Sequence, residues 1–329
     1  MAQVFNTYDT YDAVGQREEL SDAIYMLTPE DTPFMSLIGR MPVKTTHPEW
    51  QTDVLATPAT NAKIEGTEWN FEEIDETVRV GNYTQIADKR IIISRTLEKT
   101  DKAGRKSEMK RELKKKGTEL KKDMEYALLQ NNASVAGSST VPRELGGFPA
   151  WLTTNVSRGA TGADGGFNVS TGIVDAATNG TQRAFTQALL NDIMSQSYTS
   201  GGNPTTLMMA PYVKTVFSGF SGISDLRSDL NGKKQATIYA GADTYVSDFG
   251  TVTVLPNRVM ATDAATARNV FAIDPEMVKV GIFDDIQMHD PAKTGDAEKR
   301  VLNVEFTLVV KNEAAHGEVA DVYGLTASS

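Results

Sequence analysis

Cysteine is absent from this chain of 329 residues. The absence excludes disulfide bonds, thiolate metal sites and cysteine nucleophiles, and it is typical of a protein made in a reducing cytoplasm. Histidine is scarce as well, because the sequence contains only His47, His289 and His316. A histidine-rich metal site is hard to build from three residues. The sequence therefore predicts a protein without a bound metal or other cofactor.

Long hydrophobic runs are also missing. No stretch approaches the roughly 20 apolar residues that are needed to cross a bilayer. The N-terminal residues MAQVFNTYDTYDAVGQ have neither the basic start nor the apolar centre of a signal peptide. We therefore expect neither a membrane contact nor secretion, and we interpret sequons such as Asn155-Val156-Ser157 as chance matches.

An excess of positive charge is missing too. The chain has 43 Asp and Glu residues against 33 Lys and Arg residues, which gives a formal net charge of −10. This balance argues against a dedicated nucleic-acid reader, although it does not exclude a surface that merely faces DNA. With 40% hydrophobic residues the chain can build a real core, and its length suits two compact domains or one large one.

The front of the chain contains two short helical patterns. Residues 1–31 are predicted to form an arm with one short helix that ends at Thr28-Pro29. Residues 32–39, Thr-Pro-Phe-Met-Ser-Leu-Ile-Gly, predict a second helix with Thr32 as its cap and Pro33 in its first position. The second helix is an apolar plug, and its Phe34 needs another surface to cover it.

Residues 45–94 are extended in character and sparsely apolar, which predicts a long β-hairpin. Limbs of about 20 residues at ~3.3 Å per residue would reach on the order of 60 Å. Two strands alone are marginal in water and cannot bury their own aromatic side chains. We therefore favour an interface over the chain's own core for these aromatic residues, since tryptophan is common at interfaces. The expected inter-subunit contacts are Phe34, Trp50, Trp69 and Phe71.

Residues 95–131 give the strongest helical pattern, with Gly104 and Gly117 as its weak points. Apolar side chains recur at spacings of three and four among twelve Lys and Arg residues and seven Asp and Glu residues. The spacing of Glu112 with Lys116, and of Lys115 with Glu119, favours a solvated face held by ion pairs. Non-specific contact with nucleic-acid phosphates is the alternative for this face.

The rest of the chain mixes loops, helices and strands. Residues 133–180 are loop-rich around an aromatic plug at residues 145–152, and helices are expected at residues 184–199 and 212–217. The expected strands are Thr237–Tyr239, Tyr245–Ser247, Thr251–Leu255, Val270–Ile273, Met277–Ile282, Leu302–Val310 and Glu318–Tyr323, the last pairing with the one before it. The fold class that follows is α+β.

No group of residues supports catalysis. Ser221 lacks the glycine that an esterase elbow needs two positions later, and Asp248-Phe249-Gly250 lacks the other motifs of a kinase and is predicted to be a hairpin turn. A divalent-ion site at Asp284, Asp285, His289 and Asp290 is conceivable, but a solvated loop between strands is the preferred interpretation. We therefore do not expect an enzyme. A hydrolase that uses Ser221, His289 and Asp243 is the alternative.

The order of these elements resembles the tailed-bacteriophage major capsid protein family, whose Hong Kong 97-like fold is shared by tailed phages and herpesviruses. More narrowly, the chain is similar to short capsid proteins that carry a Thr-Pro-Phe plug near the N-terminus. The resemblance covers nearly the whole chain and depends on the order of its elements. The segments that carry it are Thr32–Gly39, Trp50–Ile93, Ser94–Asn131, Gly146–Leu152, Val301–Val310 and Val319–Leu325.

The resemblance implies a division of the chain and a function. Residues 1–44 would be an N-terminal arm and 45–94 an extended loop lying over a neighbouring subunit. Residues 95–180 with 285–329 would form a peripheral domain whose spine is the long helix, and 181–284 an axial domain. The protein would assemble through pentamers and hexamers into an icosahedral shell enclosing double-stranded DNA. A tail-tube or decoration subunit is the alternative.

The resemblance also implies partners and a location. These are other copies of the chain, a separate scaffolding protein, a portal, possible cement protein, and non-specific contact with the packaged DNA. The scaffolding protein would be separate because the sequence has no room before Thr32 for a long helical scaffolding segment. Assembly would take place in the bacterial host cytoplasm, and the product would be the virion head. Some relatives cross-link subunits through Lys and Asn, but nothing identifies Lys63, Asn303 or Asn312 as a reactive pair.

Overall fold

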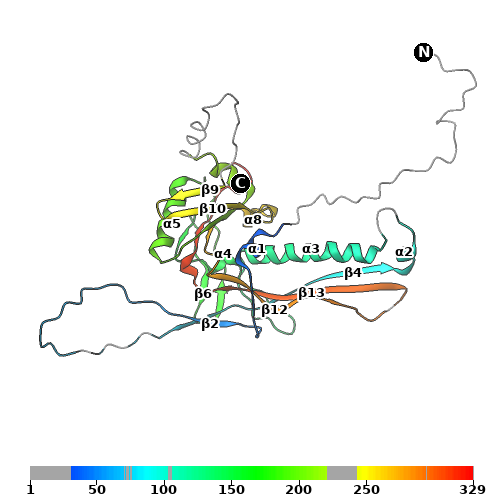
Figure 1. Cartoon of the computed structure of the whole chain (residues 1–329), viewed down its shortest axis with the longest axis horizontal. Coiled ribbons are helices and arrows are strands. Elements are labelled where there is room, and N and C mark those ends of the chain that lie inside the picture. The colour runs from blue at the N-terminus through cyan, green and yellow to red at the C-terminus, as the bar shows by residue number, and fades with distance from the viewer. Residues whose placement is uncertain are drawn as a thin grey trace, which may run out of the picture.

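The computed structural model describes residues 31–69, 71, 74, 76–102, 106–220, 243–293 and 295–328. The expected arm helix, the strand at 237–239 and Ser221 lie outside this part of the chain. Within it, helices combine with one four-stranded and one six-stranded sheet, which confirms the α+β class. Figure 1 shows a body formed around the six-stranded sheet, from which a long ribbon and a loop extend in opposite directions. None of the described helices has the length and apolarity needed to cross a bilayer.

The four-stranded sheet forms the long ribbon. Its strands, in spatial order, are β1 (Arg40–Pro42), β12 (Val278–His289), β13 (Ala297–Val310) and β4 (Gln85–Ser94). The predicted alternation in β13 is confirmed from Leu302 to Phe306, whereas from Phe306 to Val310 every side chain is buried, including Thr307 on the face that was predicted to be polar. The side chains of the predicted apolar face point toward the helix α3 (Glu108–Leu129), which runs along the ribbon in Figure 1.

The predicted helix at 95–131 is two helices. The first, α2 (Arg95–Lys99), is capped by Ser94, and the second, α3, is capped by the Ser107 hydroxyl, which accepts a hydrogen bond from the Lys110 N–H. A second serine cap begins a new helix because its side chain satisfies backbone N–H groups that lack partners at a helix start. Gly117 lies inside α3 and does not interrupt it.

The apolar plug is α1 (Pro33–Ile38), as predicted, and it docks on α3. The carboxylate of Glu125 accepts hydrogen bonds of 2.8 Å from the N–H groups of Phe34 and Met35, and one of 2.7 Å from the Asn257 amide. Burial raises the pKa of Glu125, while these hydrogen bonds act in the opposite direction. The Phe34 ring is fully buried 5.4 Å from that of Phe148. Its own chain therefore encloses Phe34, and the inter-subunit contact expected for this residue stays a prediction.

The six-stranded sheet holds most of the core. Its strands, in spatial order, are β5 (Val156–Ser157), β14 (Gly317–Val319), β11 (Val270–Ile273), β8 (Thr206–Met209), β10 (Gly250–Pro256) and β9 (Thr244–Ser247). The predicted helices appear as α5 (Gln187–Thr199), which packs on β14, and α6 (Pro211–Phe217), which packs on β10. The predicted turn at residues 248–250 joins β9 to β10.

The pairing of the last strand differs from the prediction. Strand β14 pairs with β11 and β5, not with β13. The short helix η2 (Glu313–Ala315) follows β13 and turns the chain toward the other sheet. The remaining short elements are α4 (Phe148–Trp151), β6 (Gly166–Asn168), β7 (Ile173–Asp175), η1 (Met260–Thr262) and α8 (Ala264–Ala267).

The acidic cluster near His289 lies mostly on a strand, not in a loop. Asp284, Asp285 and His289 belong to β12, which continues to the end of the ribbon because β13 supplies a partner over this length. Asp285 pairs with Arg40 at 3.7 Å. The part of the chain that the structure describes contains no group of three or more side chains placed to hold a metal ion.

Candidate assembly surface

The projecting loop is built differently from the predicted hairpin. Strands β2 (Glu49–Thr52) and β3 (Val78–Gly81) pair over only four residues, and residues 53–77 then leave the body without further pairing among the described residues. The second predicted limb ends early because residues 85–94 form β4, which pairs with β13 along its whole length. In Figure 1 the loop extends away from the body on the side opposite α2.

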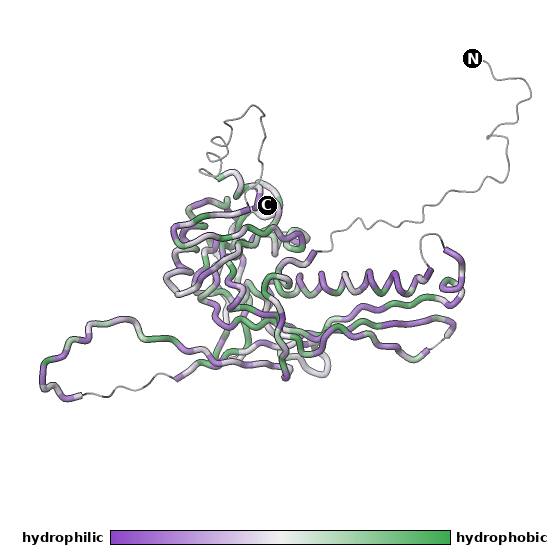
Figure 2. The backbone as a smooth tube through the Cα atoms, viewed as in Figure 1, coloured by the Kyte–Doolittle hydropathy of each residue, from purple (hydrophilic) through white to green (hydrophobic). Residues whose placement is uncertain are grey.

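Large apolar side chains on this loop face solvent. Their exposed fractions range from 84 to 94%, and the residues are Val54, Leu55, Ile64, Trp69, Phe71 and Ile74. Figure 2 shows these apolar segments alternating with hydrophilic ones along the projecting loop. Burying one such side chain gains about 1.5–3 kcal/mol. Monomeric soluble proteins rarely expose so much apolar surface in one segment, so the loop has the character of an interaction surface.

Trp50 anchors the root of the loop to its own body. Its ring stacks on Trp151 with a centroid distance of 5.6 Å, and Trp151 stacks on Phe167 at 6.0 Å. Trp50 is half-buried and packs against the main core. The structure thus separates the four predicted contact residues. Phe34 and Trp50 contact their own chain, whereas Trp69 and Phe71 are exposed. For all four residues the inter-subunit contact stays a prediction.

A groove of about 770 Å³ lies beside the root of the loop. Residues from both limbs form one wall, including Leu55 and Val80, and Trp151 with Phe167 forms another. The segment after β13 completes the lining. The sequence did not predict this groove, because its walls come from parts of the chain that only the tertiary fold brings together.

Polar contacts hold the floor of the groove in place. The Glu313 carboxylate accepts hydrogen bonds from the Thr153 and Thr154 N–H groups at 3.2 and 3.3 Å. The side-chain amide of Asn155 donates to the carbonyl groups of Ala314 and His316 at 2.6 and 2.9 Å. The segment that follows Trp151 is therefore fixed to the segment that follows β13.

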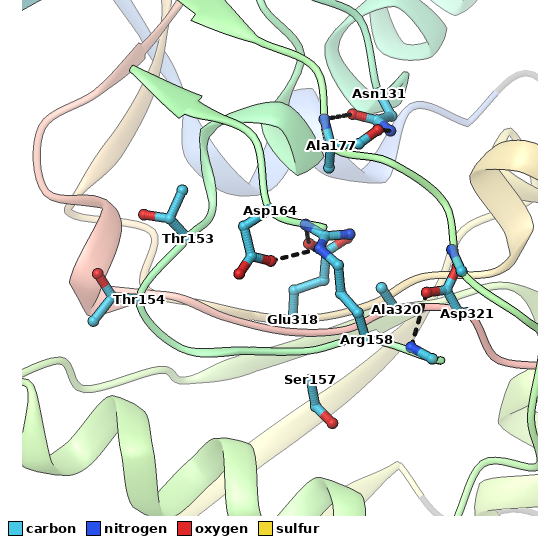
Figure 3. Close-up of polar contacts among 12 residues, drawn as sticks. Asn131, Thr153, Thr154, Ser157, Arg158, Asp164, Ala177, Glu318, Ala320 and Asp321 are labelled. Carbon is cyan, nitrogen blue, oxygen red and sulfur yellow. Dashed lines mark hydrogen bonds and ion pairs between the residues drawn. The ribbon is translucent and has the colours of Figure 1, made fainter. Parts of the chain in front are cut away.

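Two buried carboxylates continue this connection (Figure 3). Glu318 pairs with Arg158 at 3.1 Å, and the same guanidinium reaches Asp164 at 2.6 Å. Asp321 accepts hydrogen bonds from the N–H groups of residues 159 and 180 at 2.9 and 3.0 Å, and it pairs with Arg268 at 2.6 Å. Sequence reasoning missed both acids, because residues 318–323 have the pattern of an ordinary strand and the arginine partners are far away in the sequence.

The buried groups Glu318 and His316 predict how subunit stability depends on pH. Burial raises the pKa of Glu318 from 4.5 to about 8, against the opposing effect of Arg158, and burial lowers the pKa of His316 from 6.5 to about 4. Between pH 4.5 and 8 the folded chain holds more protons on Glu318 than the unfolded chain, so stability falls as pH rises. Between pH 4 and 6.5 the unfolded chain holds more protons on His316, so stability rises.

The two effects oppose each other up to pH 6.5, and above it His316 no longer opposes Glu318. We expect the free energy of unfolding of unassembled subunits to fall by at most about 1.4 kcal/mol per pH unit between pH 6.5 and 8. Denaturant unfolding at several pH values measures this decline. Glu318→Gln removes the titrating group and should abolish the decline. A variant whose stability declines in parallel with the unsubstituted chain would contradict this assignment.

The residues of the alternative hydrolase site are not brought together in the described part of the chain. His289 ends β12 in the four-stranded sheet, whereas Asp243 precedes β9 in the six-stranded sheet and accepts a 2.5 Å hydrogen bond from Lys214. Ser221 lies outside the described residues.

Solved structures that resemble this chain include capsid subunits. The chain resembles a subunit of the cyanophage A-1(L) capsid, with a TM-score of 0.65 and 13% identity over 96% of this chain and 98% of that one. It also resembles the capsid subunit of a native GTA particle, with a TM-score of 0.60 and 12% identity over 95% of this chain and 97% of that one. The fold is therefore that of the Hong Kong 97-like capsid subunits.

The sequence comparisons identify the family. The major capsid protein of Escherichia phage Phieco32 is 26% identical over 357 aligned positions, which cover 97% of this chain and 98% of that protein. The SU10 major capsid protein family matches residues 3–323. The chain belongs to this family, the major capsid proteins of tailed phages. The predicted family, fold and function are confirmed, and the chain is a component of the virion.

Proposed function

We propose that copies of this chain assemble through the loop at residues 53–77, which lies on a neighbouring subunit. The observation that carries the proposal is the exposure of six large apolar side chains on a segment that its own body does not cover. Contacts of this kind connect different surfaces of neighbouring copies, and they close into rings only at fixed rotation angles. The rings are pentamers and hexamers of an icosahedral shell around double-stranded DNA.

The role we propose is structural, without catalysis. The partners are further copies of the chain, a separate scaffolding protein, a portal and a cement protein, together with non-specific contact to the packaged DNA. Assembly takes place in the cytoplasm of the bacterial host. The similarity to a phage major capsid protein and to capsid subunits supports the shell.

Tryptophan fluorescence tests whether a neighbour covers the loop. The sequence has three tryptophans, and Trp69, at 85% exposure, is the one that solvent surrounds in a single subunit. Assembly should therefore shift the emission of Trp69 to shorter wavelength, because the indole leaves water. The Trp69→Phe variant, which keeps an aromatic ring, should assemble without this shift.

Electron microscopy of the same samples checks the form of the assembly. Closed shells together with a Trp69-dependent shift support the proposal. Shells that form while the emission of Trp69 stays unchanged would show that the loop does not lie on a neighbour. Tubes or small oligomers would overturn the shell itself.

A further inference from the structure

Helix α3 carries lysines that form no close ion pair among the described residues. Twelve of the chain's Lys and Arg residues lie between 95 and 131, although the chain as a whole is acidic. The lysines of α3 that have no ion pair in the described part of the chain form a set that we call the lysine stripe. Its members are Lys110, Lys114, Lys115, Lys121 and Lys122.

The acids that could neutralise the lysine stripe have other partners. Glu108 and Glu112 both pair with Arg111, and Glu119 pairs with Lys116 at 2.7 Å. Asp123 pairs with Lys89 of β4. The closest ion pairs therefore differ from those expected from the sequence, although Glu112 still attracts Lys116 and Glu119 still attracts Lys115 over a longer distance. This finding weakens the interpretation of the stripe as a face held by its own salt bridges.

The helical geometry gathers the stripe on one side. At 3.6 residues per turn, the five lysines occupy an arc of about 140°, whose centre lies about 130° from the buried Leu120 and Met124. Lys110, Lys114 and Lys121 are exposed, and the other two are half-buried. From Lys110 to Lys122 the stripe is about 18 Å long, which gives roughly one positive charge per 4 Å. One strand of double-stranded DNA carries a phosphate about every 3.4 Å along the helix axis. The two linear charge densities match closely.

The surroundings of the stripe favour contact with phosphates over contact with bases. The aromatic residue in α3 is Tyr126, and its hydroxyl group is engaged with Asp263 at 3.2 Å. Base recognition needs aromatic stacking or bidentate polar groups, and a row of lysine ammonium groups supplies neither. Lysine ammonium groups do bind phosphate oxygens as point charges without regard to sequence.

We infer that the lysine stripe on α3 binds the phosphate backbone of double-stranded DNA without sequence preference. This inference rests on the proposed function, because it takes the DNA inside the shell as the partner. The acidic remainder of the chain repels phosphates, so the stripe also determines which side of the subunit faces the DNA.

Salt-dependent binding of a duplex of arbitrary sequence tests the inference. Unassembled full-length subunits are titrated onto a fluorescent 30-base-pair duplex at several salt concentrations. A stripe that neutralises about five phosphates predicts a slope near −4.5 for the logarithm of affinity against the logarithm of salt concentration. Replacing all five stripe lysines by glutamine should weaken binding at least tenfold and bring the slope close to zero.

The matched control removes the same charge elsewhere. Five exposed cations outside the stripe and the loop, each replaced by glutamine, should leave affinity within about twofold; they are Lys44, Lys99, Arg258, Lys293 and Lys311. A triple variant at Lys110, Lys114 and Lys121 should give an intermediate slope, and it serves if the fivefold variant folds poorly. Equal losses in the stripe and control variants would show a general charge effect and overturn the inference.

Two further outcomes distinguish DNA from other possible partners of the lysine stripe. If the stripe binds polyglutamate but not the duplex, its partner is an acidic polypeptide and the inference fails. If the stripe variant loses shell formation that the control variant keeps, the stripe is a contact between proteins and the inference fails as well. If the stripe variant forms normal shells that retain less DNA than those of the control variant, the result supports the inference. A failure of the unsubstituted chain to form shells would count against the proposed function alone, because duplex binding by subunits is measured separately.

Discussion

A chain in which residues 54–76 are replaced by a two-residue Asn-Gly turn should fold normally and form no shells. The loop contributes no strand pairing to its own body beyond the four residue pairs of β2 and β3, so its removal leaves both sheets intact. Thr52 and Val78 are paired partners at the end of that short ladder, so a tight turn can join the strands there. The deletion removes six exposed apolar side chains, each able to supply about 1.5–3 kcal/mol on burial.

Electron microscopy and sedimentation show whether particles form, and circular dichroism with thermal unfolding shows that the subunit is folded. The deletion must stop before residue 85, because β4 belongs to the ribbon. Val141→Ser serves as a control, since it removes an apolar side chain of 49% exposure away from the loop and should leave shells intact. Normal shells from the shortened chain would contradict the role of the loop.

Asp321→Ala should destabilise the subunit by about 3–5 kcal/mol, the range for removing one partner of a buried ion pair. Its carboxylate is fully buried, accepts two backbone hydrogen bonds and pairs with Arg268, so truncation leaves all these donors without their acceptor. The backbone at Asp321 has φ +62, a left-handed conformation that alanine adopts less readily than aspartate or asparagine.

Denaturant unfolding of unassembled subunits measures this loss. Asp321→Asn is the matched control, because it keeps the shape, one oxygen acceptor and tolerance of the left-handed backbone, and it loses only the charge. We expect its destabilisation to be clearly smaller than that of Asp321→Ala. Equal stability of Asp321→Ala and the unsubstituted chain would show that the Arg268 pair contributes nothing net to folding.

Local patterns in the sequence predicted the helices and strands in which buried side chains recur at a regular spacing along one segment. The alternation from Leu302 to Val310 identified β13, and Pro211 marked the start of α6. The turn at residues 248–250 followed from short strands on both sides. In each of these elements the side chains of one face repeat at the period of the strand or helix, so a single segment contains enough information.

Contacts between distant segments were not predictable in the same way. Strand β4 was assigned to the hairpin because its partner β13 lies some two hundred residues later, and no local signal distinguishes the two pairings. Phe34 and Trp50 were assigned to an interface because the surfaces that cover them, around Phe148 and Trp151, belong to another part of the sequence. Aromatic residues in polar segments show that a cover exists, but they do not show whether it comes from the same molecule.

The slight attachment of the loop has a consequence for the geometry of a shell. The four residue pairs of β2 and β3 connect the two limbs of the loop only to each other, in a two-stranded sheet of their own. The packing of Trp50 and Val80 against the core attaches these limbs to the body, whereas the two large sheets are extensively paired. In the proposed shell, neighbours in five-membered and six-membered rings would meet at different angles. A loop with so small an attachment could adjust to both angles while the two large sheets keep their structure. One polypeptide can then serve every position of a curved lattice, with the adjustment concentrated at residues 49–52 and 78–81.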